Sequence, residues 1–350
     1  MTDNAEGGPR THVGPGAGLR LADAHADSLM WNRPLEQAGH GGHVDFPRLE
    51  QAGVALQCFT VVTGGFPYVG GFPLFARWRG WPAAAHRDAW SRYRFQVEAL
   101  RRACEASGGR VQRTTTRAEL DRHLASGAVS AVLGVEGGQV LEGDPGRLAV
   151  LVEDGVRFIG LTHLSNNALG GSSFPAPHRP GLSREGHEVV EAMRAKGVAV
   201  DLAHASPKTI ADVLTHREVP LMCSHTGVSG AKRHFRNLRD PELRAIADRG
   251  GVVGIILAPV YLGGRDLDAV ARHIEHALDV MGEEGVGLGS DFDGMVGMPR
   301  GIRDVRDLPR VAEVLLARGH PISRVERVMG GNWIRFFREL LGRFDALPGQ

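Results

Sequence analysis

Short apolar runs rich in β-branched residues recur along the chain. Each is bounded by glycine or proline, a pattern typical of short buried strands. The eight runs are residues 21–27, 54–62, 131–138, 156–163, 198–206, 220–227, 251–259 and 286–294. Their almost continuous apolar character favours strands that are covered on both faces, as in a parallel sheet.

Helix-like segments separate most of these runs. Three of them carry apolar side chains at helical spacing and are residues 91–107, 184–197 and 268–282. Two more are marked by their first residues, because Ser206 and Asp240 are predicted N-caps and each precedes a proline at the first helical position. Gly250 is predicted to end the second of these helices.

The alternation of strand and helix through eight repeats predicts an α/β fold, a (β/α)8 TIM-type barrel. An open, doubly wound sheet is the alternative. It would favour a glycine-rich phosphate-binding turn after the first strand, and the sequence has none there. Because no linker or low-complexity tract follows residue 20, we expect a flexible segment over 1–20 and one barrel domain over 21–345.

Two connections are long, residues 63–90 and 164–183. Both follow a strand, so in a barrel both rise on the face where active sites are built. Loops of this length at such a face are often lids or pocket walls. Packing over the barrel rim or at a dimer contact is the alternative.

Charge and composition exclude several partners. The 350 residues carry a net charge of +1, from 41 basic and 40 acidic side chains, and no basic run stands out. We therefore expect no nucleic-acid partner and no anionic membrane surface. No apolar stretch approaches the roughly 20 residues of a membrane span, and the N-terminal residues lack the apolar region of a secretory signal. The three widely spaced cysteines suit free thiols, so a cytoplasmic protein is expected.

Ionisable side chains gather at the ends of the predicted strands. They are His25, Asp27, Glu136, His163, His204, His225, Asp291 and Asp293. A single histidine beside apolar residues is usually a hydrogen-bonded structural group. Burying this many imidazoles and carboxylates together without partners would be costly. One or two divalent cations would remove that cost by supplying positive charge.

The donor set contains nitrogen and oxygen but no thiolate, which suits Zn²⁺, with Mn²⁺ or Co²⁺ also conceivable. It has too many members for one tetrahedral catalytic zinc, so two metals sharing a bridging carboxylate fit better, with Glu136 as the central acid. His25 and Asp27 share one face of a strand and are predicted to bind the same metal. Asp23 lies one step deeper. We interpret it as a supporting or core group, with direct ligation as the alternative.

These residues lie in motifs that occur in a fixed order. The motifs are "DAHAD", "GVEGG", "GLTH", "GLSREGHEVVEAMRAKGVAVDLAHAS", "CSHTG", "RNLRD", "GLGSDFDG" and "GGNWIRFF". From about residue 20 to residue 340 the chain resembles the membrane dipeptidase (renal dipeptidase) family, whose members are binuclear zinc peptidases on a (β/α)8 barrel. The resemblance implies a TIM-type barrel of the metallo-dependent hydrolase-like kind. The long block over 181–206 is the most specific part of the resemblance.

The resemblance implies a ligand set of five residues around two Zn²⁺ ions. His25 and Asp27 would bind one zinc, Glu136 would bridge both, and His204 with His225 would bind the other. It also implies that His163 contacts the substrate near the scissile carbonyl.

For the substrate, the resemblance implies that Arg236 receives its terminal carboxylate and that Asp291 holds the bridging water and accepts its proton. Arg239 is the alternative anchor, but Arg236 directly precedes the asparagine of the family pattern. Two positions depart from that pattern, with Ala26 in place of asparagine and Gln139 in place of a common histidine. Neither is an implied ligand, so they bear on the shape of the pocket.

The expected activity is hydrolysis of the amide bond of dipeptides by hydroxide held between two zinc ions. The sequence lacks the signal and lipid anchor of the animal members, which favours a soluble bacterial member, and the family suggests a homodimer. Two alternatives stay open. One is another barrel metallohydrolase, such as a lactonase, N-acyl amino acid deacylase or deaminase. The other is a non-catalytic scaffold in a biosynthetic pathway. The sequence argues against a scaffold, because every implied ligand position carries a residue that can bind metal.

Overall fold

A closed parallel barrel is the framework of the computed structural model, which describes residues 18–64, 71–141, 144, 146–175, 178 and 180–346. The strands in chain order are β1 (Leu21–Asp23), β2 (Val54–Val62), β3 (Val111–Arg113), β4 (Val129–Glu136), β5 (Val156–Gly160), β6 (Ala199–Asp201), β7 (Leu221–Thr226), β8 (Val253–Ile255) and β9 (Val286–Leu288). They are hydrogen-bonded in the order β2-β1-β9-β8-β7-β6-β5-β4-β3, and β2 also pairs with β4. The predicted TIM-type barrel is confirmed.

The barrel closes between β2 and β4, and β3 lies outside it. Residues 56–62 of β2 pair in parallel with residues 130–136 of β4. On its other edge, β4 pairs first with β3 through residues 129–131 and then with β5 from Leu133 onwards. Eight strands therefore form the barrel, and β3 is an extra edge strand that the apolar pattern did not predict.

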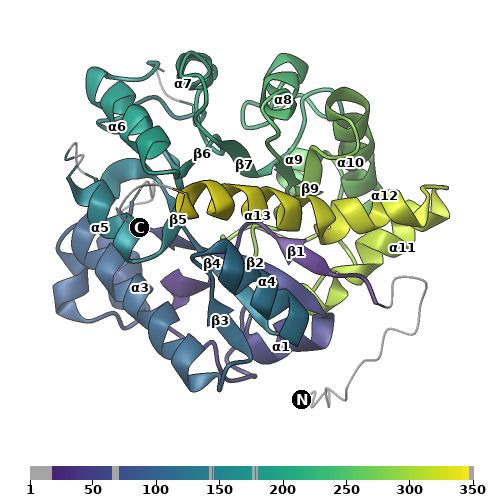
Figure 1. Cartoon of the computed structure of the whole chain (residues 1–350), viewed down its shortest axis with the longest axis horizontal. Helices are drawn as coiled ribbons and strands as arrows, with labels where there is room; N and C mark the ends of the chain where they lie inside the picture. Colours follow the sequence, from purple (N-terminus) through teal and green to yellow (C-terminus); the bar gives the residue numbers. More distant parts are fainter. Residues whose placement is uncertain are drawn as a thin grey trace.

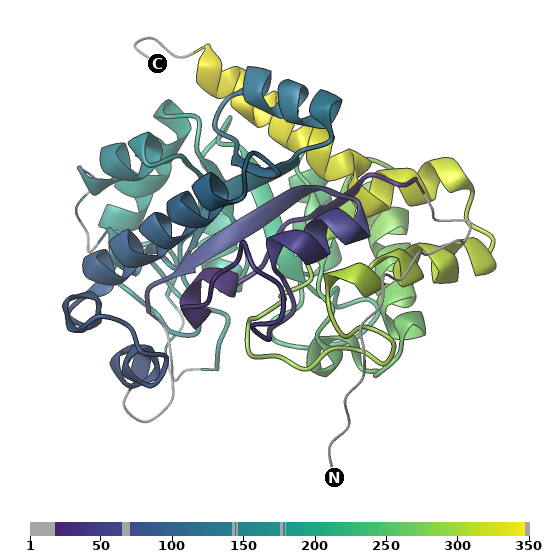
Figure 2. The same cartoon turned by 90° about the horizontal axis from the view of Figure 1, so that it is seen from below.

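Helices surround the barrel, as Figure 1 and Figure 2 show. They are α1 (Phe46–Ala52), α2 (Gly71–Trp78), α3 (Ala89–Ala106), α4 (Arg117–Ser126), α5 (Arg147–Glu153), α6 (Arg184–Ala195), α7 (Pro207–Val213), α8 (Asp240–Ala247), α9 (Pro259–Leu262), α10 (Leu267–Met281), α11 (Pro309–Ala317), α12 (Ile322–Glu326) and α13 (Asn332–Asp345). The helices expected over 91–107, 184–197 and 268–282 correspond to α3, α6 and α10. No helix among the described residues is both long and apolar enough to cross a lipid bilayer.

The helix α13 lies across the amino-terminal end of the barrel (Figure 1). The indole Nε1 of Trp333 donates a hydrogen bond to the carbonyl of Leu288 at 2.8 Å, and the Asn332 amide donates to the carbonyl of Val286 at 2.8 Å. The ring of Phe337 packs 6.2 Å from that of Phe158 in β5. This buried aromatic face closes the amino-terminal end of the barrel, opposite to the carboxyl ends of the strands where the ionisable side chains lie.

Two helix starts test the predicted caps. Ser206 caps α7 as expected, with its side chain accepting a hydrogen bond from the backbone N–H of Thr209. The cap of α8 was predicted one residue late, because Arg239 is the N-cap and Asp240 is already helical. The carboxylate of Glu242 accepts the backbone N–H of Arg239 at 2.8 Å and so satisfies this helix start.

Several predicted strands are too long at their carboxyl ends. The run over 21–27 is a regular strand only as far as Asp23, and the run over 286–294 only as far as Leu288. Beyond Leu288 the backbone turns, because Asp291 and Asp293 adopt left-handed conformations that no strand can continue through, and His204 does the same beyond β6. The strand ends are therefore short turns that redirect the ionisable side chains.

The long connection over 63–90 is not a structureless loop, because it contains α2 and a 3-10 turn over Ala83–His86. The predicted flexible segment over 1–20 lies almost entirely outside the described residues, so it stays a prediction. The cysteines are free, as expected, with Cys58 and Cys223 buried and Cys104 half-buried.

Candidate metal centre and active site

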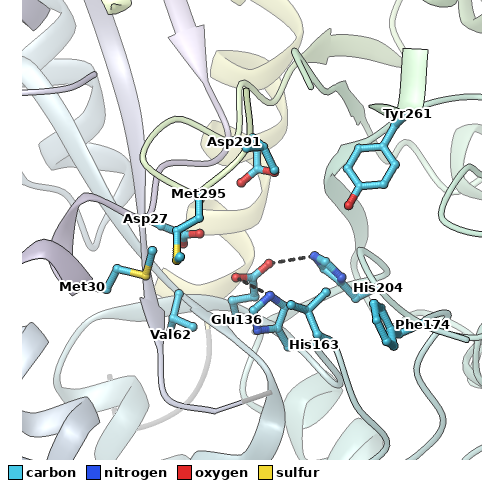
Figure 3. Close-up of a pocket in the computed structure, with 13 residues that line it drawn as sticks. Asp27, Met30, Val62, Glu136, His163, Phe174, His204, Tyr261, Asp291 and Met295 are labelled. Carbon is cyan, nitrogen blue, oxygen red and sulfur yellow. Dashed lines mark ion pairs between the residues drawn. The ribbon is translucent and has the colours of Figure 1, made fainter. Parts of the chain in front are cut away.

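The carboxylate of Glu136, at the end of β4, is the centre of the site. Its Oε1 lies 3.1 Å from His204 Nε2, 3.5 Å from His225 Nε2 and 3.6 Å from His25 Nε2. Its other oxygen, Oε2, lies 3.5 Å from His163 Nε2. Figure 3 shows the carboxylate of Glu136 with its ion pairs to His163 and His204 in the wall of the cavity. One carboxylate thus faces four imidazoles that come from four different strand ends.

The histidines themselves are in contact. The rings of His25 and His225 have centroids 3.8 Å apart, and those of His204 and His225 are 5.0 Å apart. The Nε2 atoms of His204 and His225 are separated by only 3.0 Å. Residues far apart in the sequence are therefore brought together by barrel closure, as the sequence analysis required.

The site has the composition and spacing of a metal centre. Three buried groups each place their donor atoms within 4.8 Å of one another, and these groups are His25–Glu136–His225, Glu136–His163–His204 and His25–Asp27–Asp291. Two of the buried donor atoms, His25 Nε2 and Glu136 Oε2, have no hydrogen-bond partner within the described structure. Buried polar atoms without partners are rare, and a cation would satisfy both. The residues present fit a divalent metal.

Burial and neighbouring charge set the protonation of the imidazoles. Burial holds the pKa values of His204 and His225 well below the usual histidine range, and the positive charge of Arg236 adds to this effect. Burial also lowers the pKa of His25, but the negative charges of Asp27 and Glu136 outweigh it and raise the pKa to about 10. Neutral imidazole is the form that binds a metal, so His204 and His225 are in the ligand form already.

Burial shifts the pKa values of the carboxylates upwards, because it disfavours their negatively charged form. Burial raises the pKa of Glu136, and it raises the pKa of Asp291 well above the usual range, with the charge of Asp27 adding to the effect for both. Asp27 Oδ1 accepts a hydrogen bond from the Thr60 hydroxyl at 2.5 Å. Three acids thus share one buried space, and a divalent cation there would offset their mutual repulsion.

His163 is oriented by the chain that follows β2. Its Nδ1 lies 3.0 Å from the carbonyl of Gly64, which can only accept, so Nδ1 carries a proton. Its Nε2 faces Glu136 and carries a second proton only in the imidazolium form. This atom can therefore act as a metal ligand when neutral or as a hydrogen-bond donor when charged.

Asp291 projects from a tight turn that we call the acid turn, residues 291–295. Its backbone is left-handed, with φ of 61°. A Cβ on Gly294 would lie 1.9 Å from Asp291 Oδ1 and 3.1 Å from Asp27 Oδ2, so only glycine fits there. The turn is folded tightly against the carboxylate that it presents.

A cavity of about 210 Å³ opens above these groups. Its walls add side chains that the sequence analysis did not identify, namely Met30, Val62, Leu164, Phe174, Tyr261, Met295 and Val296. Leu164 and Phe174 belong to the long connection over 164–183, which supports the pocket-wall interpretation of that loop. Each wall residue ends or follows a strand, and that position was the only feature in the sequence that pointed to them.

The two candidate arginines lie in very different surroundings. Arg236 is 4% exposed, and its Nη2 donates a hydrogen bond to the carbonyl of His225 at 2.8 Å, while its Nε has no partner in the described structure. Arg239 caps α8 and pairs with Glu242 at the surface, where its side chain is 59% exposed. Arg236, and not Arg239, brings positive charge to the metal centre.

Two acids of the sequence motifs have other partners. Asp23 accepts hydrogen bonds from the Gln57 amide at 2.8 Å and from the Ser290 backbone and hydroxyl at 2.7 Å each. It belongs to none of the three donor groups. This favours the core interpretation over direct ligation. Asp293 pairs with Arg33 and also stands outside the three groups.

Ser224 is a site residue that sequence reasoning missed. Its hydroxyl lies 3.2 Å from His25 Nδ1 and 2.9 Å from His225 Nδ1. An oxygen that accepts from both Nδ1 atoms leaves Nε2 as the nitrogen through which each ring can bind a metal, and both Nε2 atoms face Glu136. Its place directly before His225 on β7 was the only available hint.

Ser224→Ala is expected to weaken metal binding by about 10- to 100-fold, because groups that orient a ligating histidine contribute on that scale. Competition with a chromophoric chelator would measure the affinity. Ser107→Ala is the matched control, since Ser107 is buried and bonds only to backbone at the end of α3. Equal metal affinity in the Ser224 variant and the wild type would contradict the orienting role.

Known proteins resemble the chain over most of its length. It matches the family described as membrane dipeptidase (peptidase family M19) over residues 17–342. Dipeptidase aclJ of Aspergillus oryzae is 31% identical over 334 residues, which cover 90% of this chain and 76% of that protein. Dipeptidase verJ of Clonostachys rogersoniana is 34% identical over 243 residues, which cover 69% of this chain and only 63% of that protein.

Solved structures agree with this assignment. A metallopeptidase from Rhodobacter sphaeroides, liganded with a phosphinate mimic of the dipeptide L-Ala-D-Ala, is 25% identical with a TM-score of 0.80 and covers 93% of this chain and 99% of its own. The family expected from the motifs is thereby confirmed. The chain belongs to the membrane dipeptidase family, peptidase family M19, and is a metallopeptidase of the dipeptidase class.

Proposed function

We propose that this protein hydrolyses the amide bond of dipeptides with two divalent metal ions, and that these are zinc. The observation that carries the proposal is the position of Glu136, whose Oε1 lies within 3.6 Å of three histidine Nε2 atoms. A carboxylate in that position suits a bridge between two metals. Membership of a dipeptidase family supports the substrate class.

His25 and Asp27 would hold one ion and His204 with His225 the other, with Glu136 shared between them. The spacing of the donor groups also allows His25 to face Glu136 and His225 together. The division of ligands between the two ions therefore rests on the family resemblance. When bound, such ions would lower the pKa of a coordinated water to roughly 7 and so supply hydroxide at neutral pH.

Asp291 and His163 would handle the protons and the developing charge. The Asp291 carboxylate faces the same space as Asp27 and Glu136 and can accept the proton of the attacking water. His163 would donate from Nε2 to the carbonyl oxygen as an imidazolium, because its Nδ1 proton is held by Gly64. A donor of this kind is worth about 3–4 kcal/mol in the transition state.

Arg236 would bind the free carboxylate of the dipeptide. Its guanidinium is planar and always charged, so it can bind both carboxylate oxygens at once. Arg236 is buried beside His225. Its positive charge lies close enough to lower the pKa values of Glu136, His204 and Asp291. An anchor this close to the metal centre would select substrates whose carboxylate lies one residue beyond the scissile bond.

Arg236→Gln is expected to lower kcat/KM for a dipeptide by roughly 30- to 1,000-fold, because losing one partner of a buried charge pair costs about 2–4 kcal/mol. Steady-state kinetics would measure it. Arg239→Gln is the matched control and should keep wild-type kinetics. A dipeptide with a C-terminal amide should lose little further activity in the Arg236 variant. If both variants discriminate equally against the amide, Arg236 is not the anchor.

The direct test of the proposal compares substrate classes on one metal-analysed preparation. Dipeptides, N-acyl amino acids, lactones and aminopyrimidines would be offered at equal concentrations, with metal content measured by elemental analysis. We expect dipeptide turnover and two metal ions per chain. Exclusive turnover of another class would reject the substrate, and well under two ions would reject the two-metal centre. The predicted homodimer would be tested separately, by measuring the molar mass in solution with light scattering.

A further inference from the structure

A second acid of the acid turn, Asp293, is buried away from the reacting groups. Its carboxylate is 2% exposed and accepts hydrogen bonds from the Ser28 hydroxyl at 2.5 Å, from the His43 backbone N–H at 2.7 Å and from the Arg33 guanidinium. Its backbone carbonyl accepts the Trp31 indole N–H at 2.6 Å. The Asp293 carboxylate thus accepts from three donors, and the backbone carbonyl of the same residue accepts from a fourth.

All of these donors belong to one segment, residues 28–45, which connects β1 to α1. The same segment carries Met30, a wall of the cavity. The guanidinium of Arg33 also donates to the carbonyl of Val44 at 2.8 Å, and the His43 Nδ1 accepts the backbone N–H of Asp293 at 3.0 Å. Asp293 therefore joins this segment to the acid turn through both its side chain and its backbone.

The acid turn needs such support. Asp291, Asp293 and Met295 have φ of 61°, 65° and 64°, so three of its residues other than glycine are left-handed. Residues with side chains disfavour that conformation and hold it only where their surroundings impose it. Met295 is a cavity wall like Met30, so the turn shapes both the acid and the pocket.

We infer that Asp293 is a positioning residue for the reaction. By fixing residues 28–45 to the acid turn, it sets the direction of the Asp291 carboxylate and the spacing of Met30 and Met295 across the cavity. The inference rests on the proposed function, because it assumes that Asp291 accepts the proton of water. Asp293 itself lines no part of the cavity and touches none of the implied ligands.

The test compares Asp293→Asn with Asp304→Asn in the full, metal-loaded protein. Asp304 is also buried and paired with an arginine, Arg306, but caps the turn before α11 and contacts no cavity residue among those described. Asp293→Asn should lower kcat for a dipeptide by about 10- to 100-fold with KM and metal content nearly unchanged, since small misplacement of a reacting group costs that much. Asp304→Asn should keep its kcat.

A second variant covers loss of stability. Arg33→Met combined with Asp293→Asn leaves no unpaired buried charge, so its melting temperature should recover while its kcat stays low. Recovery of kcat together with melting temperature would overturn the inference, as would a wild-type kcat in folded Asp293→Asn. Failure of the proposed function has a different result, in which Asp291→Asn keeps full activity or the wild type leaves dipeptides intact.

Discussion

Asp291→Asn should keep both metal ions and lose about 10²- to 10⁴-fold in kcat, the usual contribution of a positioned acid–base group. Asparagine has the same shape, so the acid turn and its contact with Gly294 are retained. It cannot accept a proton, however, and burial has already removed bulk water as a substitute, because Asp291 is 7% exposed. Single-turnover kinetics on protein of measured metal content would give the loss in the chemical step.

Metal content decides what any loss of activity means. Asp291 shares a donor group with His25 and Asp27, so it is close enough to be a ligand. If Asp291→Asn loses a metal ion together with its activity, Asp291 binds metal and is not the proton acceptor. If it keeps both ions and full kcat, the proton goes elsewhere. Only a loaded and inactive variant agrees with the proposed role.

His204→Ala should lose one of the two metal ions and nearly all turnover. The His204 imidazole lies 3.1 Å from Glu136 and 3.0 Å from His225. Its removal takes away one donor and leaves Glu136 and His225 with too few ligands to hold the ion between them. In the proposed two-metal centre, Glu136 would then share only one ion, and the cost of its burial would be compensated less. Elemental analysis after dialysis should give about one ion per chain.

His187→Ala is the matched control for this experiment. His187 lies on α6 and contacts His216 on the outside of the barrel, at 2.8 Å between ring nitrogens. The control should keep two ions and wild-type kcat. Two ions retained in His204→Ala would show that His204 is not a ligand. An inactive His187 variant would show that the assay reports folding and not the metal centre.

The gathering of these side chains could be predicted because a parallel barrel places the carboxyl ends of its strands together. Strand periodicity pointed to His25 and Asp27, and the ends of the apolar runs pointed to Glu136, His204 and His225. The structure places His25, His204 and His225 around the carboxylate of Glu136. No distance had to be known for this, since the carboxyl ends of parallel strands meet whatever their lengths. The same reasoning placed the long connection over 164–183 at the cavity, where Leu164 and Phe174 form part of the wall.

What the pattern could not predict depends on contacts between distant segments. Ser224 is an ordinary polar residue in the sequence and becomes significant only because closure places it between two histidines. Asp293 was grouped with the ionisable side chains at the strand ends, yet it is bonded to residues 28–45 and paired with Arg33. β3 has one buried residue in three and forms only because β4 offers it an edge. Tertiary context decides each of these.

The packing of α13 under the barrel affects the order in which the site can mature during synthesis. Trp333 and Asn332 are bonded to the last strand, and Gly330 approaches the backbone of Arg20 beside the first, so this region ties the two together. Asp291 and every residue implied in metal binding precede this helix in the sequence and are therefore synthesised before it. We therefore expect a nascent chain to contain the full set of implied donors before the helix that closes the barrel is available, and firm metal binding to follow only once the C-terminal segment has been synthesised.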